Sequence, residues 1–151
     1  MKKFRFSLET VLDYKQQALD SLRAEHGAIL AQVRAQEQAV QALEEEHRRA
    51  DDEFTQRKLE GINVLDALSF EQYLRALERK LQVEYYKLEE LRRREERKRD
   101  QVVEARKETA TIEKLKEHKL EDYRKAVQKS EETMIEEFVS TTRAMAAAGS
   151  R

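Results

Sequence analysis

The feature that most constrains this chain is a stripe of apolar residues that recurs at alternating spacings of four and three, with no proline anywhere. This spacing places the apolar side chains on one side of an α-helix, where they form the seam of a coiled coil. The first stripe runs through Leu8, Leu12, Lys15, Leu19, Leu22, His26, Ile29, Val33, Gln36, Val40, Leu43, His47, Ala50 and Phe54. It predicts one continuous helix over about residues 8–59.

The stripe stops between Phe54 and Phe70, and the intervening residues carry signals for a connection. Gly61 predicts a helix C-cap, because glycine tolerates the left-handed conformation that often follows a helix. Ser69, with Gln72 three residues later, predicts a capping box at the start of a second helix. We therefore expect a loop at about residues 60–69 and a second helix over about residues 70–144.

A second stripe follows and changes phase once, near Leu115. Two helices that are joined by a short loop and pair with each other run antiparallel. The sequence thus predicts an all-α fold in which residues 1–151 form a single coiled-coil domain, an antiparallel hairpin of two long helices with the second one longer. The second stripe runs through Phe70, Leu74, Leu77, Leu81, Glu84, Leu88, Leu91, Glu95, Lys98, Val102, Ala105, Thr109 and Ile112, then through Leu120, Tyr123, Val127, Ser130, Met134 and Phe138.

The unequal helix lengths predict an interaction surface. At about 1.5 Å per residue the helices would be roughly 80 and 110 Å long, so residues from about Tyr123 onward have no partner within the hairpin. Their stripe would expose Tyr123, Val127, Met134, Ile135 and Phe138. Exposed apolar surfaces of this kind usually mark interaction sites. The alternative is that this end of the helix simply frays.

Composition limits the classes of partner. Charged residues make up 40% of the chain but the net charge is only -1, so the long-range attraction of a basic protein to nucleic acid is missing. The basic run at residues 92–99 is interleaved with glutamates, which is typical of a solvated helix face; contact with an acidic partner is the alternative. No window approaches the ~20 apolar residues of a membrane span. We expect a cytoplasmic protein with neither a nucleic-acid partner nor membrane insertion.

Residues that could carry chemistry are scarce. His26 and His47 share the first stripe but lie ~30 Å apart along a helix, too far to bind one metal ion. We interpret them as seam residues that fix the register of the two helices. A two-helix hairpin also encloses no pocket in which different polar groups converge. The sequence therefore predicts no catalytic residue, no cofactor and no metal, and a protein that is not an enzyme.

Three segments of the chain form a distinctive set. They are Phe4-x-Phe6-x-Leu8-x-x-Val11-Leu12-x-Tyr14-Lys15, Phe70-x-x-Tyr73-Leu74-x-x-Leu77, and Ile112-Glu113-Lys114-Leu115-Lys116-Glu117 followed by Tyr123. Together these segments resemble the FliJ family of flagellar type III export proteins, and the resemblance covers nearly the whole chain. Near the end, Glu136-Glu137 stands where the family often has an Asp-Glu pair.

The resemblance implies a coiled-coil stalk, similar to the shaft subunit of rotary ATPases, that serves flagellum biogenesis and motility. It would bind the hexameric export ATPase, promote its assembly and activity, and link it to the cytoplasmic domain of the export-gate membrane protein and to export chaperones. It would act as a cytoplasmic monomer, peripherally associated with the membrane-bound export apparatus. The implied residues are Phe4, Phe6, Leu8, Tyr123, Met134 and Phe138 at the ATPase end, and Tyr73 and Leu77 toward the export gate.

Other interpretations stay open at the level of sequence. Tyr73 and Leu77 also fit the packing of the hairpin itself. The chain could be a general escort that captures helical segments of chaperones on the unpaired stripe, with no ATPase role. It could also be a structural scaffold in which two chains pair in parallel.

Overall fold

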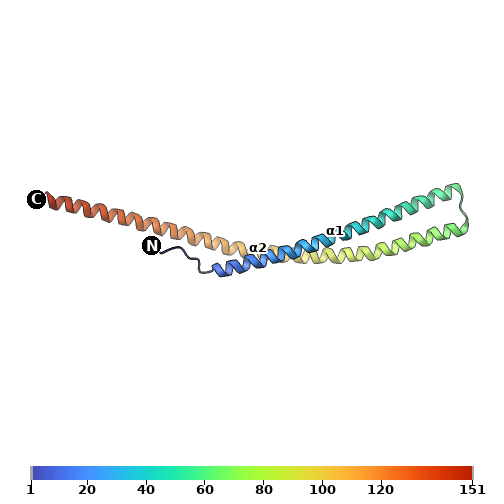
Figure 1. Cartoon of the computed structure of the whole chain (residues 1–151), viewed down its shortest axis with the longest axis horizontal. Helices are drawn as coiled ribbons and strands as arrows, with labels where there is room; N and C mark the ends of the chain where they lie inside the picture. Colours follow the sequence, from blue (N-terminus) through green and yellow to red (C-terminus); the bar gives the residue numbers. More distant parts are fainter. Residues whose placement is uncertain (1, 151) are drawn as a thin grey trace. The chain divides into compact units, whose positions relative to one another are not determined.

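The computed structural model describes residues 2–150, and this range contains two α-helices and no strand. Helix α1 spans Glu9–Glu60 and helix α2 spans Val64–Gly149 (Figure 1). The helices pack against each other as an antiparallel hairpin, and the second is the longer one. The predicted fold class is therefore confirmed.

The chain divides into two compact units, which are described separately. Residues 19–104, which include the connection between the helices, form the loop unit; residues 1–18 together with 105–151 form the terminal unit. Each unit contains part of α1 and part of α2.

The connection between the helices is shorter than the sequence predicts. It comprises only residues 61–63, and α2 begins six residues before position 70. Gly61 has a φ of 102°, as expected of a C-cap glycine. The N-cap of α2 is Asn63, whose side-chain Oδ1 accepts a hydrogen bond of 2.8 Å from the backbone N–H of Asp66. Ser69 therefore lies inside α2, where its hydroxyl donates to the Leu65 carbonyl at 3.1 Å.

The core of the loop unit forms where the two stripes meet, and Figure 1 shows the helices side by side there. Near the connection, the rings of Phe54 and Phe70 stack with centroids 5.2 Å apart. The Lys58 ammonium lies 3.8 Å from the Phe54 ring centroid, and Arg57 lies over Phe70, so cations cover both rings. Two clusters of buried side chains make up this core: Ala50, Phe54, Leu74 and Leu77, and farther along Val33, Val40, Leu81 and Leu88.

Polar residues on the first stripe of the loop unit all face glutamates of α2. A helix slipped by one turn would separate these groups, so their pairing favours a single register. The pairs are His26 Nε2 with Glu95 Oε1 at 2.9 Å, Gln36 Nε2 with the Glu84 backbone carbonyl at 3.0 Å and also with its carboxylate, and His47 Nε2 with Glu78 Oε1 at 3.2 Å.

In the terminal unit the two helices pair over a short stretch. Leu12 of α1 and Thr109 of α2 are buried. The Lys15 ammonium donates to Glu108 at 2.7 Å, and this hydrogen bond, with the charge of Glu108, raises the pKa of Lys15. The predicted phase change is present, because Leu115 is exposed and the α2 residues shielded from solvent continue at other positions. They are Thr109, Ile112, Lys116, Leu120, Tyr123 and Val127.

Leu77 should be the most sensitive position of the loop unit. Its side chain is only 1% exposed, so Leu77→Ala leaves a cavity between the helices. We expect a loss of about 3 kcal/mol in the free energy of unfolding, measured by urea denaturation with circular dichroism. Val83→Ala, on the exposed side of the same helix, is the matched control and should cost less than about 0.5 kcal/mol. Equal losses in the two variants would contradict this assignment of the core.

Glu84 should make the hairpin sensitive to acid. Hydrogen bonds from Gln36 and then Lys87 hold the pKa of Glu84 below its ordinary value of 4.5. Because the folded pKa is the lower one, the charge stabilises the hairpin above pH 4.5, and this stability is lost as pH falls through the folded pKa. We expect the thermal midpoint of Glu84→Gln to fall less between about pH 5 and about pH 3 than that of the unmodified protein. Glu71→Gln, exposed on the same helix, should keep the full acid dependence.

Candidate functional site

The segment that precedes α1 is fixed to α2 by aromatic residues. The rings of Phe4 and Tyr123 have centroids 5.6 Å apart and are tilted by 49°. The Tyr123 hydroxyl donates to the Lys2 carbonyl at 2.6 Å, so both ends of the tyrosine hold the segment. Phe6 is half-buried, whereas Leu8 is 36% exposed and gives its carbonyl to the first turn of α1. Four residues that the resemblance implies for the ATPase end are thus on or against this segment.

Ion pairs and hydrogen bonds hold α1 and α2 together beside the segment. Lys116 donates to Glu9 at 2.8–2.9 Å. The Gln16 amide donates to the Glu113 carboxylate at 3.2 Å. These contacts, with the pair formed by Lys15 and Glu108, fix the position along α2 at which α1 begins.

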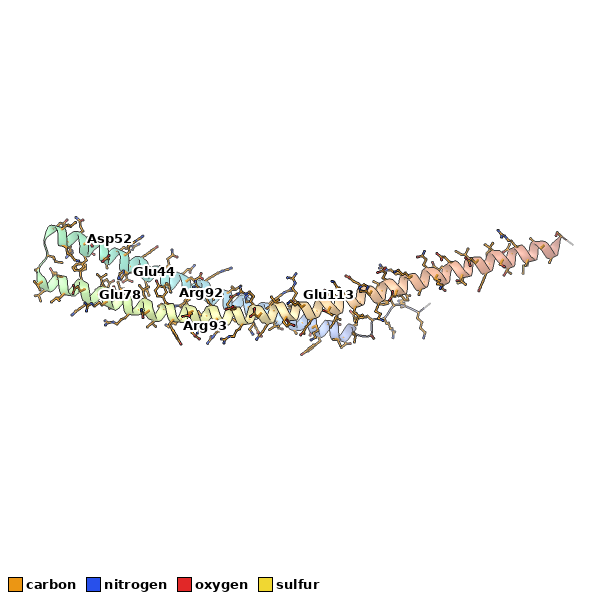
Figure 2. The ribbon with its side chains drawn as sticks, turned by 180° about the vertical axis from the view of Figure 1, so that it is seen from behind. Glu44, Asp52, Glu78, Arg92, Arg93 and Glu113 are labelled. Carbon is orange, nitrogen blue, oxygen red and sulfur yellow. The ribbon has the colours of Figure 1, made fainter. Side chains whose placement is uncertain are left out.

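Beyond Val127, α2 continues with none of the described segments packed against it. We call residues 128–149 of α2 the overhang; every one of them is exposed to solvent. Met134 is 67% exposed and Phe138 is 74% exposed. Figure 2 shows the side chains of this end of α2 projecting into solvent. The predicted unpaired stripe is present at Met134, Ile135 and Phe138, but it starts farther along α2 than the sequence predicts, because Tyr123 packs against Phe4. Val127 is half-buried as well, and Val139 and Met145 are further exposed apolar residues of the overhang.

The overhang and the aromatic segment belong to the same unit but do not coincide. Phe138 follows Tyr123 by fifteen residues, which is roughly 22 Å along a helix. The structure therefore brings Phe4 and Tyr123 together and leaves Met134 and Phe138 farther along α2. A partner that touches all of them needs a surface about as long as four helical turns.

The two positions implied for the export gate differ sharply in accessibility. Tyr73 is 44% exposed, and its hydroxyl donates to the carboxylate of Glu46, which raises the pKa of Tyr73. Leu77 is 1% exposed and belongs to the core near the connection. Of the two, only Tyr73 offers a surface to a partner while the helices are paired. Packing in the core, which the sequence left open for Leu77, is what the structure shows.

The basic run of α2 is largely engaged with nearby carboxylates. Arg93 contacts Glu89 at 2.8 Å and Glu90 at 3.2 Å, both on its own helix. Arg92 reaches across to Glu37 of α1 at 3.2 Å. Figure 2 shows Arg92 and Arg93 on α2 and Glu44 on α1, with side chains of both signs along the helices. This is the geometry of a solvated, charge-matched face.

The course of the stripe through the overhang depends on the spacing that is continued. The alternation of four and three passes through Ser130. The shielded residues of the terminal unit follow spacings of three, four and four, whose continuation passes through Glu131; Ser130 and Glu131 are both exposed. The eleven-residue separations of Ile112, Tyr123 and Met134 indicate the second spacing.

Both helices, apart from the last two residues of α2, lie within the region that a protein-family model matches. A family model described as "Flagellar FliJ protein" matches residues 4–147. The chain belongs to the FliJ family. Members of this family are non-catalytic components of flagellar export, so the chain is a flagellar export protein. No match was found among curated proteins or among solved structures.

Two further observations describe the surface. Neither α1 nor α2, within the residues described, has a window long and apolar enough to cross a bilayer. Among residues 2–150, no three histidine, cysteine or acidic side chains gather in a way that could hold a metal ion. The candidate site consists of two surfaces of the terminal unit, the aromatic segment and the overhang.

Removing the Tyr123 ring should release the segment before α1. Tyr123→Ala loses both the ring contact with Phe4 and the hydrogen bond to Lys2, whereas Tyr123→Phe loses only the hydrogen bond. We expect trypsin to cleave after Arg5 about tenfold faster in the alanine variant and about threefold faster in the phenylalanine variant, as measured by mass spectrometry. Tyr86→Ala in the loop unit should leave the cleavage rate unchanged. A rate that is the same in all variants would show that Tyr123 does not hold the segment.

Proposed function

We propose that this protein is a coiled-coil stalk that binds the hexameric flagellar export ATPase and promotes its assembly and activity. The observation that carries this proposal is the terminal unit, which ends in a long helix with an unpaired apolar stripe. Membership of the FliJ family supports the setting in flagellar export. The chemistry of ATP hydrolysis belongs to the ring, and the stalk contributes contacts.

The overhang is suited to a central position in a ring. A single helix that extends beyond its hairpin is narrow, and its five large apolar side chains are free to contact neighbouring subunits. Such a stalk has one apolar side and cannot contact six identical subunits in the same way. It therefore favours one conformation in some subunits and another in the rest, which biases nucleotide binding around the ring.

We further propose that the loop unit faces the export-gate membrane protein and the export chaperones. Tyr73 is the implied gate residue with accessible surface, and it lies beside Glu46 of α1. A contact there would place the gate and the ATPase on different units of the same chain. The protein would thereby link the two without inserting into the membrane.

The overhang also favours a second candidate function, the capture of export chaperones. An exposed apolar stripe on a helix is the surface that an amphipathic helix of another protein covers. In that case the protein is a chaperone escort with no ATPase role. The stalk needs Met134 and Phe138 to bind the ATPase, whereas the escort needs them to bind chaperones. One experiment can therefore separate the two functions.

The experiment adds the full chain to the cognate export ATPase at one molecule per six subunits. We expect faster ATP hydrolysis and more hexamer by sedimentation. The double variant Met134→Asp with Phe138→Asp should bind the ATPase about 30-fold more weakly, because two apolar anchors are replaced by charges. Val83→Asp with Tyr86→Asp is the matched control on exposed apolar residues of the loop unit and should behave like the unmodified protein.

Two results would contradict the stalk. The first is an ATPase rate and hexamer fraction that the unmodified protein leaves unchanged. The second is a Met134 and Phe138 double variant that still stimulates the ATPase but no longer retains export chaperones in a pull-down. The second result would identify the escort as the function of the overhang.

A further inference from the structure

The shielded residues of α2 in the terminal unit follow an eleven-residue repeat. Their spacings are three, four and four, from Thr109 through Val127. A repeat of this length corresponds to about 3.67 residues per turn, close to an undistorted α-helix, so helices that pack on it run almost straight. Continued without a break, the repeat assigns one face of the overhang: Glu131, Met134, Phe138, Thr142 and Met145.

This face is a direct extension of the interface between α1 and α2. Up to Val127 the repeat is covered by α1 and the segment before it, and from Gln128 onward every residue is exposed. The spacing of the repeat is the same on both sides of Val127, and α2 is helical on both sides. Helix α1 covers the repeat as far as Lys116, which pairs with Glu9, and the segment before α1 covers it at Tyr123. Because the spacing on which α1 packs continues unchanged into the overhang, an α-helix fits the continued face.

Glu131 specifies the charge of that helix. It lies between Val127 and Met134 on the apolar face, and covering it without a partner would leave a desolvated carboxylate. Charged residues on the two stripes are matched across the helices, as in the pairs of Lys15 with Glu108 and His26 with Glu95. By the same rule, the helix on the overhang needs a cation opposite Glu131.

A second copy of this chain does not satisfy that requirement. In an antiparallel pair that sets Met134 against Phe138 of the other copy, Glu131 faces Thr142, whose hydroxyl already donates to the Phe138 carbonyl of its own helix at 2.8 Å. In a parallel pair, Glu131 faces itself. Either arrangement also brings together two overhangs that are each net acidic, because residues 128–149 contain Glu131, Glu132, Glu136 and Glu137 but only Lys129 and Arg143 as cations.

We propose that residues 127–145 of α2 form a docking face for an amphipathic α-helix of basic character from another protein. That helix packs apolar residues against Met134 and Phe138 and places a lysine or arginine on Glu131. The face is about 27 Å long, which corresponds to about 18 residues of partner helix. The inference rests on the proposed role of the overhang as a binding surface, and it specifies the partner that the surface accepts.

A charge-swap experiment tests this with the full chain and two synthetic helical peptides. Each peptide carries leucines at spacings of three, four and four and basic residues on its flanks, with lysine in one and glutamate in the other at the central position of the leucine face. Fluorescence anisotropy of the labelled peptides gives the affinities. We expect the lysine peptide to bind at least about tenfold more tightly than the glutamate peptide, and Glu131→Lys to reverse the preference.

Glu136→Lys is the matched control. It makes the same change of charge five residues along the overhang, off the repeat, and should leave the preference for the lysine peptide within about twofold of the unmodified protein. Three results would overturn the proposal: equal binding of the two peptides, a preference that Glu131→Lys does not reverse, or a dimer of the chain through the overhang in sedimentation velocity. The peptide assay contains no ATPase and the ATPase assay contains no peptide, so failure of either proposal is seen separately.

Discussion

The structure depends on the matching of two stripes, one on each helix, at apolar and polar positions alike. Apolar burial supplies the driving force but is tolerant of slippage, because leucines at similar spacings can pack in several registers. The polar positions remove that tolerance. Gln36 reaches both the backbone and the carboxylate of Glu84, and a shifted helix would leave these groups facing apolar side chains. Register, and with it the point at which α1 stops covering α2, is set by these few contacts.

The end of that cover separates the two kinds of surface on the chain. In the loop unit most apolar side chains of the stripes are buried in the core, and Leu77 is therefore not accessible to a partner. In the terminal unit, the segment before α1 continues to cover α2 beyond the first turn of α1, through the contact between Phe4 and Tyr123. Past that contact α2 keeps its pattern of apolar residues, but from Gln128 onward no other described segment buries them. Exposed apolar surface therefore concentrates where the hairpin stops packing on itself, which is why the proposed binding sites lie there.

The stripes predicted both helices and their pairing, since the periodicity that identifies a coiled coil is also what buries its core. The connection was harder to predict because two N-cap signals compete within seven residues. Asn63 caps α2, and Ile62 and Ala67 pack on the core near the connection, at the positions of a hydrophobic staple. The Ser69 signal had no such packing to support it. The spacing in the terminal unit was hard to predict for a different reason: four-three and three-four-four spacings coincide over one turn, and only burial up to Val127 shows which of them this part of α2 follows.

A helix that extends without a neighbour needs a physical reason to stay helical, since isolated helices of this length are marginal in water. The cost of an isolated helix lies mainly in its first turn, and the overhang avoids it by continuing from a turn already fixed against α1. Local hydrogen bonds add support, as between the Gln128 amide and Glu132 at 3.1 Å and between the Thr133 hydroxyl and the Lys129 carbonyl at 2.9 Å. The face around Met134 and Phe138 is thus formed before a partner arrives. Binding a partner then costs little conformational entropy in the overhang, so more of the free energy of apolar contact contributes to the affinity.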